Sequence, residues 1–188
     1  MEVVSRVLQF WYDEPAPDPA ADGEYNTAWF EKNDAFDQAI RDGFEIDVAA
    51  AAAGELDALR ETPQGCLTLC ILLDQFPRNL YRGSAQAFAT DPVALSVARH
   101  AVANEFHLQL GLTRRMFVYL PFEHSENMED QNRSVELFKA SNDATTYPYA
   151  LEHYYVISRF GRFPGRNAAL GRETTPEEAV FLEKFGSY

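Results

Sequence analysis

The chain has 188 residues and a formal net charge of −13, and 46% of its residues are hydrophobic. This apolar content, with 14 Phe and 9 Tyr, is enough for a packed core and excludes an intrinsically disordered chain. A negative field opposes binding to nucleic acid and to anionic membrane surfaces, so neither is expected as a partner.

Signals for export or membrane insertion are not expected. The longest apolar run, residues 66–73, is far shorter than the roughly 20 residues that a membrane-spanning helix needs. Polar side chains interrupt the apolar residues near the N-terminus, which argues against a signal peptide. Cys66 and Cys70 lie in the apolar run and are expected as reduced core residues. Together these features predict a cytoplasmic protein, with residues 1–188 forming one domain.

Apolar residues recur at helical spacing in residues 2–12, which predicts a first amphipathic helix. Three prolines in residues 13–23 indicate a loop. A second helix is expected from about Thr27 through an alanine run, with Gly54 as its natural stop.

A third helix is expected to open at Thr62-Pro63, an N-cap followed by proline at the first helical position. It should run to Gln75, because Pro77 ends or kinks a helix. Asp91-Pro92 repeats the start signal and predicts a helix over residues 93–106.

The remaining chain carries four further helical patterns. Residues 114–122 form the first, and Pro121 is expected to break it before residues 123–127. The others are expected at residues 128–140, at residues 147–160 with Gly161 as the stop, and after the capping-box sequence Thr175-Pro176-Glu177-Glu178. Strand-like alternation is scarce and hairpin turn sequences are absent, so the sequence predicts an all-α bundle of seven to nine helices in antiparallel hairpins.

Charge is unevenly distributed along the chain. Residues 1–70 hold 15 acidic and 4 basic residues, a net charge of −11, whereas residues 71–188 hold 14 and 12, a net charge of −2. Ten of those 12 basic residues are arginines, which form planar, bidentate pairs with carboxylates and phosphates. This bias is the first indication of an anion site.

The first block rich in polar side chains is residues 74–82, which follows the apolar run. Asp74 and Arg78 are four residues apart and would pair if the helix continues through Pro77, and Arg82 lies one turn further. The pair has two interpretations, a helix-end ion pair or part of a binding site.

The second block is residues 119–131. On a single helix, Glu123, Glu126 and Asp130 would share a face, which is how carboxylates are presented to a cation or a catalytic proton, and His124 lies beside them. The alternative is a solvated acidic turn in which Ser125 or Asn127 caps the next helix. The Glu-x-x-His pairing of di-iron bundles is absent, so no metal and no cofactor are predicted.

The third block is residues 159–167, downstream of His153. Arg159, Arg162 and Arg166 alternate there with Phe, Gly and Pro, which predicts a rigid basic loop able to bind an anion. The alternative is that these arginines neutralise the carboxylates of the other two blocks across the core. The nucleophile-elbow, dinucleotide-binding and Walker A sequences are all missing, which excludes nucleotide binding by the usual loops.

These blocks resemble a known family. The sequences LDQFPRN at 73–79, YLPFEHSE at 119–126 and RFGRFP at 159–164 resemble the signature blocks of the bacterial family called domain of unknown function 924. VLQFW at 7–11 and TPEE at 175–178 match it too, so the resemblance spans nearly the whole chain. It implies an all-helical, tetratricopeptide-like fold and brings no established activity. In this family a histidine usually follows the Phe-Pro, where this chain has Gly165.

Three functional hypotheses follow, and none assigns a catalytic residue. The leading one is a cleft that binds a small anionic metabolite. Its predicted lining residues are Asp74, Arg78, Arg82, Glu123, His124, Glu126, His153, Arg159, Arg162 and Arg166. The second is a module in which helical hairpins form a groove for a protein partner. The third is a hydrolase or metal-dependent enzyme that uses the carboxylates and histidines of residues 123–126 with His153.

Overall fold

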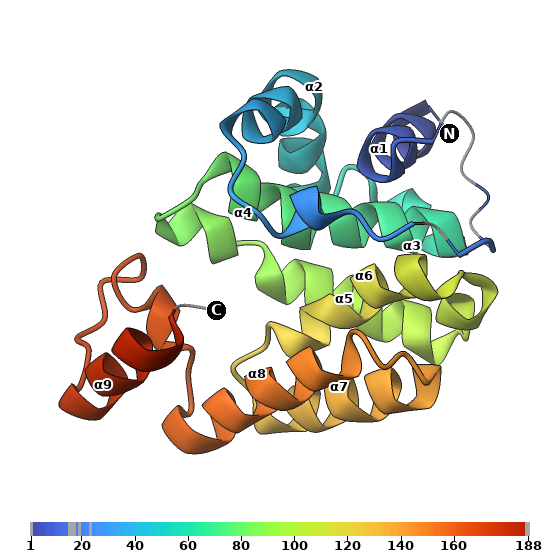
Figure 1. Ribbon diagram of the computed structural model, residues 1–188. Helices are drawn as coiled ribbons and strands as arrows, with labels where there is room; N and C mark the ends of the chain where they lie inside the picture. The colour runs from blue at the N-terminus through green and yellow to red at the C-terminus, as the bar shows by residue number, and fades with distance from the viewer. Residues whose placement is uncertain (1, 15–17, 19, 23, 187–188) are drawn as a thin grey trace.

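The computed structural model describes residues 2–14, 18, 20–22 and 24–186, and these contain helices and no strand (Figure 1). The predicted all-α class is therefore confirmed. The tetratricopeptide-like arrangement of the hairpins, and with it the interaction-module hypothesis, stays a prediction. The α-helices are α1 (Glu2–Tyr12), α2 (Asp34–Ala52), α3 (Pro63–Cys70), α4 (Phe76–Leu80), α5 (Asp91–Ala103), α6 (Leu112–Glu123), α7 (Met128–Ser141), α8 (Tyr147–Phe160) and α9 (Pro176–Phe185).

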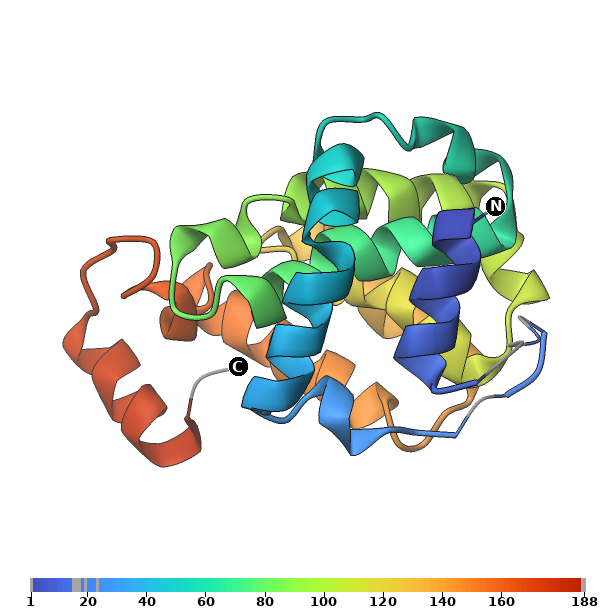
Figure 2. The ribbon, with the colours of Figure 1, turned by 90° about the horizontal axis from the view of Figure 1, so that it is seen from above.

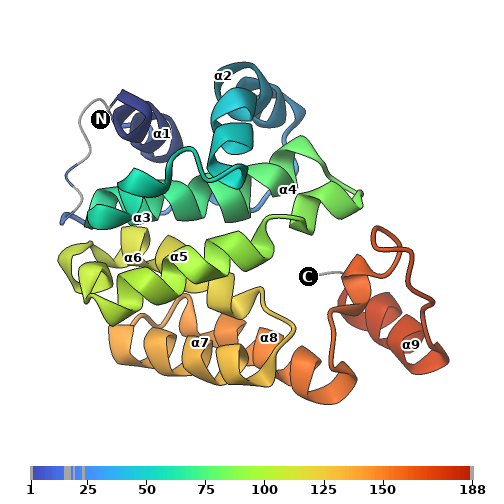
Figure 3. The same ribbon diagram turned by 180° about the vertical axis from the view of Figure 1, so that it is seen from behind.

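Helices α1 and α2 lie side by side across the run of α3 and α4 (Figure 2). Helices α5 and α6 pack beneath that run, and α7 and α8 form an antiparallel pair on the far side (Figures 1 and 3). Helix α9 lies beyond the end of α8, apart from the main stack of helices (Figure 3). Short turns join the helices, among them the 3-10 turns η1 (Thr27–Trp29), η2 (Asp57–Glu61), η4 (Ala85–Phe88), η5 (Phe106–Gln109) and η6 (Pro164–Arg166).

The main core contains side chains from α1 to α8 and is rich in aromatic rings. Trp11 stacks on Trp29, and both rings contact Phe117 edge to face. The indole Nε1 of Trp29 donates a 2.7 Å hydrogen bond to the backbone oxygen of Trp11, which fixes the segment before α2 against α1. A smaller separate cluster joins α8 to α9 and consists of Val156, Ile157, Phe163 and Phe181.

Several predicted helix ends are confirmed by their capping contacts. The Thr62 side chain accepts a hydrogen bond from the backbone N–H of Gly65 at the start of α3. Thr175 and Glu178 form the complete capping box of α9. Gly54 and Gly161, with φ of 78° and 68°, end α2 and α8 in the left-handed conformation that glycine adopts without strain.

Two predicted boundaries are wrong. Helix α2 begins at Asp34 rather than at about Thr27, because the Asn33 side chain accepts hydrogen bonds from the backbone N–H groups of the first turn. The helix predicted over residues 93–106 ends at Ala103, and Glu105 adopts a positive φ of 58° before the next 3-10 turn.

The predicted break at Pro121 is also wrong. Helix α6 continues through Pro121 to Glu123, where the proline removes a single N–H from the last turn. The carboxylates of residues 123–131 therefore do not share one helix, since Glu123 ends α6 and Asp130 lies on α7. The alternative reading of this block is confirmed in one respect, because Asn127 caps α7 by accepting a hydrogen bond from the N–H of Glu129.

A π turn, η3 (Ile71–Gln75), joins α3 to α4. The N–H of Phe76 bonds to the carbonyl of Ile71, five residues earlier, and Pro77 follows without an N–H of its own. The chain remains helical through Pro77 to Leu80. Asp74 lies in this turn and Arg78 one turn later, so the irregular segment carries the first predicted block.

Both cysteines are buried and free, as their position in the apolar run predicts. Among the helices of the described residues, none combines the length and the apolar composition needed to cross a bilayer.

Candidate functional site

A cavity of about 590 Å³ opens between α4, α6, α8 and the turns η4 and η6. Its volume lies within the range of small-molecule sites, about 300–1,000 Å³. Six of the ten predicted residues line it, and they come from all three sequence blocks: Arg78, Arg82, Glu123, His124, His153 and Arg166.

Aromatic side chains form much of the remaining wall. They are Tyr25, Trp29, Phe30, Phe88, Phe138, Tyr149 and Phe163. Their apolar faces and the polar groups of the three blocks meet in one hollow, which is the usual composition of a ligand pocket.

Asp74 lies behind the cavity wall and orients His124. The side chain of Asp74 is fully buried, and its two carboxylate oxygens lie 2.8 and 2.9 Å from Nδ1 of His124. Burial opposes the charge of Asp74, but Arg78 and His124 outweigh it, and the pKa of this carboxyl lies well below its usual range. The imidazole therefore donates its Nδ1–H to an ionised carboxylate, and its lone pair is on Nε2.

Asp91 links two arginines that are far apart in the sequence. Its carboxylate accepts hydrogen bonds of 3.0 and 3.2 Å from Arg78 and one of 3.1 Å from Arg166. Arg78 also lies 3.4 Å from Asp74, and Arg166 donates to the backbone oxygen of His124. One carboxylate thus positions both guanidinium groups at the cavity wall.

The guanidinium of Arg166 also lies against two aromatic rings. Its central carbon is 4.7 Å from the ring centre of Phe88 and 4.6 Å from that of Phe163. Burial, and after it the positive charge of Arg78, lowers the pKa of Arg166 to about 10. The position therefore favours additional negative charge.

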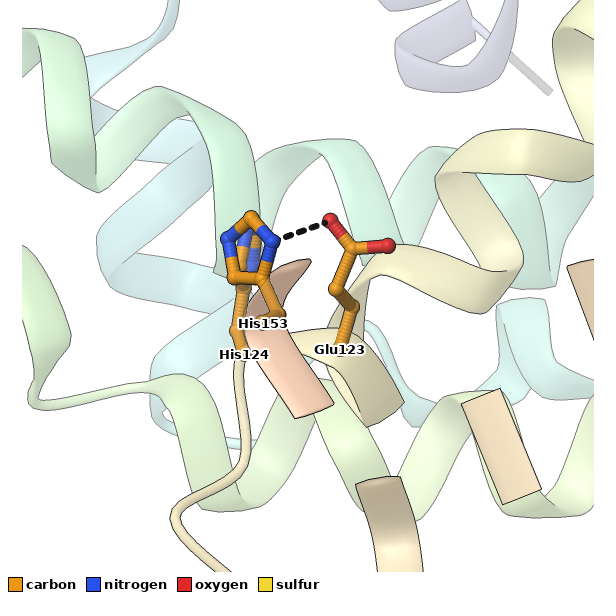
Figure 4. A group of neighbouring side chains, drawn as sticks. All are labelled: Glu123, His124 and His153. Atoms are coloured by element: carbon orange, nitrogen blue, oxygen red, sulfur yellow. Dashed lines mark ion pairs between the residues drawn. The ribbon is translucent and has the colours of Figure 1, made fainter. Parts of the chain in front are cut away.

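Glu123 and His153 form a second carboxyl–imidazole contact in the same cavity. Nδ1 of His153 lies 3.2 Å from Oε1 of Glu123, as Figure 4 shows, and 2.9 Å from the backbone oxygen of Tyr149. The carbonyl can only accept, so Nδ1 carries the proton.

Burial disfavours charge on both of these groups. It raises the pKa of Glu123 to about 8, with a further rise from the negative charges of Asp74 and Glu152. It lowers the pKa of His153 to about 3. At pH 7 the contact therefore joins a protonated carboxyl group and a neutral imidazole.

Three predicted residues, Glu126, Arg159 and Arg162, lie away from the cavity, and Arg82 lies at its rim. Glu126 accepts two hydrogen bonds from Arg172 and one from the N–H of Phe163. Arg159 and Arg162 pair with Glu177 and Glu178 of α9. Arg82 reaches the rim and pairs with Asp37 of α2. The structure therefore divides the third block, with Arg166 at the cavity and the other two arginines paired with glutamates of α9.

Asp91 and the aromatic wall are missing from the sequence-based set. Asp91 followed by Pro92 is an ordinary helix start, so nothing local marked it as a partner of two arginines. The side that each aromatic ring turns toward the cavity depends on tertiary packing.

Comparisons with known proteins place the chain in a family. The family model described as "Bacterial protein of unknown function (DUF924)" matches residues 7–186. A solved structure of a protein of unknown function from Agrobacterium tumefaciens, ATU0120, is similar at 39% sequence identity and a TM-score of 0.87, over 97% of this chain and 98% of that one. A search of curated proteins gives no match. The chain therefore belongs to the DUF924 family of bacterial proteins of unknown function.

Proposed function

We propose that the protein binds a small organic anion in the cavity. The observation that carries this proposal is the placement of Arg78 and Arg166, from segments 88 positions apart, at the wall of a hollow that is otherwise largely aromatic. Guanidinium groups held in a fixed orientation recognise carboxylate and phosphate groups through paired N–H donors.

The charge around the two arginines supports an anionic ligand. Asp91 is shared between both guanidinium groups, and Asp74 divides its oxygens among Arg78, His124 and the side-chain amide of Gln75. Burial is the main cause of the lowered pKa of Arg166, because it removes the guanidinium from water. An anion beside this guanidinium would stabilise its charged form.

The rest of the wall indicates the body of the ligand. Phe88 and Phe163 flank Arg166, and Tyr25, Phe30 and Tyr149 are about half exposed at the cavity. Such surfaces bind flat or apolar groups. The chemistry that fits is a carboxylate or phosphate head on an aromatic or apolar body.

The binding test uses anions that share this chemistry. Benzoate, phenylacetate and phenyl phosphate are titrated by calorimetry and thermal shift, with inorganic phosphate as the isolated head group and benzamide as the uncharged analogue. We expect binding of at least one aromatic anion and none of benzamide, because the arginines recognise the charge. Binding of benzamide as tight as that of benzoate contradicts the proposal.

Two variants and a matched control locate the binding. Arg166→Gln and Arg78→Lys should each weaken the anion by about tenfold or more, the cost of losing a charged hydrogen bond in a buried site. Arg159→Ala removes an arginine from the neighbouring segment that pairs with Glu177 outside the cavity, and its affinity should equal that of the wild type. Equal losses in all three variants, or none in the two cavity variants, contradict the assignment.

A further inference from the structure

Glu123, His124 and His153 bring three metal-binding side chains together in the cavity (Figure 4). One carboxylate oxygen and one ring nitrogen of each histidine lie within 4.8 Å of one another. A tetrahedral Zn²⁺ ion with bonds of about 2.1 Å holds its ligand atoms about 3.4 Å apart. The separations therefore exceed the tetrahedral spacing by at most about 1.4 Å.

Hydrogen bonds from outside the cluster fix both imidazoles in the form that a metal requires. Nδ1–H of His124 donates to the buried carboxylate of Asp74, and Nδ1–H of His153 donates to the backbone oxygen of Tyr149. Each ring therefore carries its lone pair on Nε2. Carboxylate and carbonyl acceptors behind the second nitrogen are the usual support of metal-binding histidines.

An unsatisfied oxygen is an independent indication of a ligand at this place. The side chain of Glu123 is 3% exposed, and its Oε2 has no hydrogen-bond partner among the described residues. Buried carboxyl oxygens are normally hydrogen-bonded, so an orphaned one calls for an explanation. A cation that displaces the proton of this carboxyl group to the solvent and is coordinated by the resulting carboxylate would remove the deficit.

The nearby charges do not exclude a cation. Arg78 and Arg166 are the neighbouring positive groups, and Asp74 and Asp91 balance them. Glu152 adds negative charge close to Glu123. Charged groups of both signs therefore surround the cluster.

We infer that Glu123, His124 and His153 form a binding site for one divalent transition-metal ion. Two imidazoles and one carboxylate are a common Zn²⁺ ligand set, and three protein ligands leave a coordination position for water or a substrate group. This inference goes beyond anion binding and does not depend on it, since metal binding is measured without any organic ligand.

The test is a titration of metal-depleted protein. Protein treated with a chelator and dialysed is titrated with ZnCl₂ by calorimetry, and with Co²⁺ while the visible absorption is recorded. We expect one equivalent of Zn²⁺ to bind, and the bound Co²⁺ to absorb more strongly than the hexaaqua ion, because coordination by three side chains lowers its symmetry and coordination number.

Variants show whether these residues are the ligands. Glu123→Gln keeps the shape of the side chain, and His153→Asn removes the imidazole; each should weaken Zn²⁺ by at least about tenfold. His100→Asn, which alters a half-buried histidine of α5 outside the cluster, should bind like the wild type. Circular dichroism and thermal unfolding identify any variant that fails to fold.

The outcomes separate the proposals. No stoichiometric Zn²⁺ binding by the folded wild type, or binding that survives both cluster variants, overturns the metal site. The variants that test anion binding change Arg78 and Arg166 instead. If one proposal fails, the result for the other can therefore still be interpreted.

Discussion

At the scale of single residues, two buried carboxyl groups in one cavity have opposite charge states. Asp74 is ionised because Arg78 and His124 surround it, whereas Glu123 has no cation against it and stays protonated at pH 7. Pairs of groups whose pKa values are pushed apart in this way are typical of functional sites. The same contrast makes Asp74 a structural requirement for the site around it.

Replacing Asp74 by Asn should therefore destabilise the protein at pH 7. The amide cannot compensate Arg78, and it presents an N–H₂ group where His124 needs an acceptor, so we expect a loss of about 2–4 kcal/mol in the free energy of unfolding. Urea unfolding of the variant and the wild type measures it. Asp57→Asn, at an exposed ion pair with Arg60, is the control and should cost less than about 1 kcal/mol. Equal losses would contradict the role given to Asp74.

At the scale of elements, the turn after α8 decides which arginines reach the cavity. Arg159 at the end of α8 and Arg162 after the cap at Gly161 both pair with α9, while η6 places Arg166 at the cavity. The sequence analysis predicted that Arg159, Arg162 and Arg166 all line the cavity, because the sequence does not show on which side of the turn each side chain lies. Gly165 lies in η6 beside Arg166.

The pairing of Arg162 with Glu178 should make the attachment of α9 sensitive to acid. Arg162 lowers the pKa of Glu178 to about 2, below the ordinary value of 4.5. The resulting stabilisation is complete above about pH 4.5 and is lost as the pH falls through 2. Glu178→Gln should therefore lower the melting temperature most above pH 5, with the difference shrinking toward pH 2.

Thermal unfolding of both proteins between pH 2 and 7 measures this difference. Glu177→Gln, the exposed neighbour that pairs with Arg159, is the matched control and should show a smaller change at every pH. A difference for Glu178→Gln that is independent of pH would rule out the ion pair as its cause.

At the scale of the whole molecule, the stack from α1 to α8 and the appended α9 have cores of very different size. The main core extends through eight helices, whereas Val156, Ile157, Phe163 and Phe181 form the cluster that joins α9 to α8. Regions with few buried apolar contacts open at lower free energy than the rest of a protein.

Amide hydrogen exchange should therefore show α9 opening before α3. Peptides covering residues 176–185 should exchange at least about tenfold faster than those covering residues 66–73, which are buried on nearly all sides. Mass spectrometry under native conditions measures both. Equal protection of the two segments would mean that α9 unfolds together with the main core.

Local chemistry explains how much of this architecture the sequence could predict. Helix ends set by a cap and a proline or glycine, such as Thr62-Pro63 and Thr175-Pro176, were predicted because the contacts that define them are only a few residues long. The continuation of α6 through Pro121 and the start of α2 were not predicted, because α6 tolerates a proline near its end and the side chain of Asn33 caps α2 after the predicted start. The three sequence blocks located the cavity, but Asp91 and the aromatic wall depend on contacts over long distances in the chain.

The π turn between α3 and α4 determines the direction in which the side chains of α4 point around the helix axis. It accommodates one residue more than a regular α-helical turn, and each residue of an α-helix advances the chain by about 100° around the axis. Deleting one residue between Ile71 and Leu73 would restore a regular helix and keep its hydrogen bonds, yet it would rotate Arg78 by about 100° relative to α3. The hydrogen bonds from Arg78 to Asp91 thus depend on an irregularity in the backbone. A regular α-helix would not place Arg78 in this position at the cavity wall.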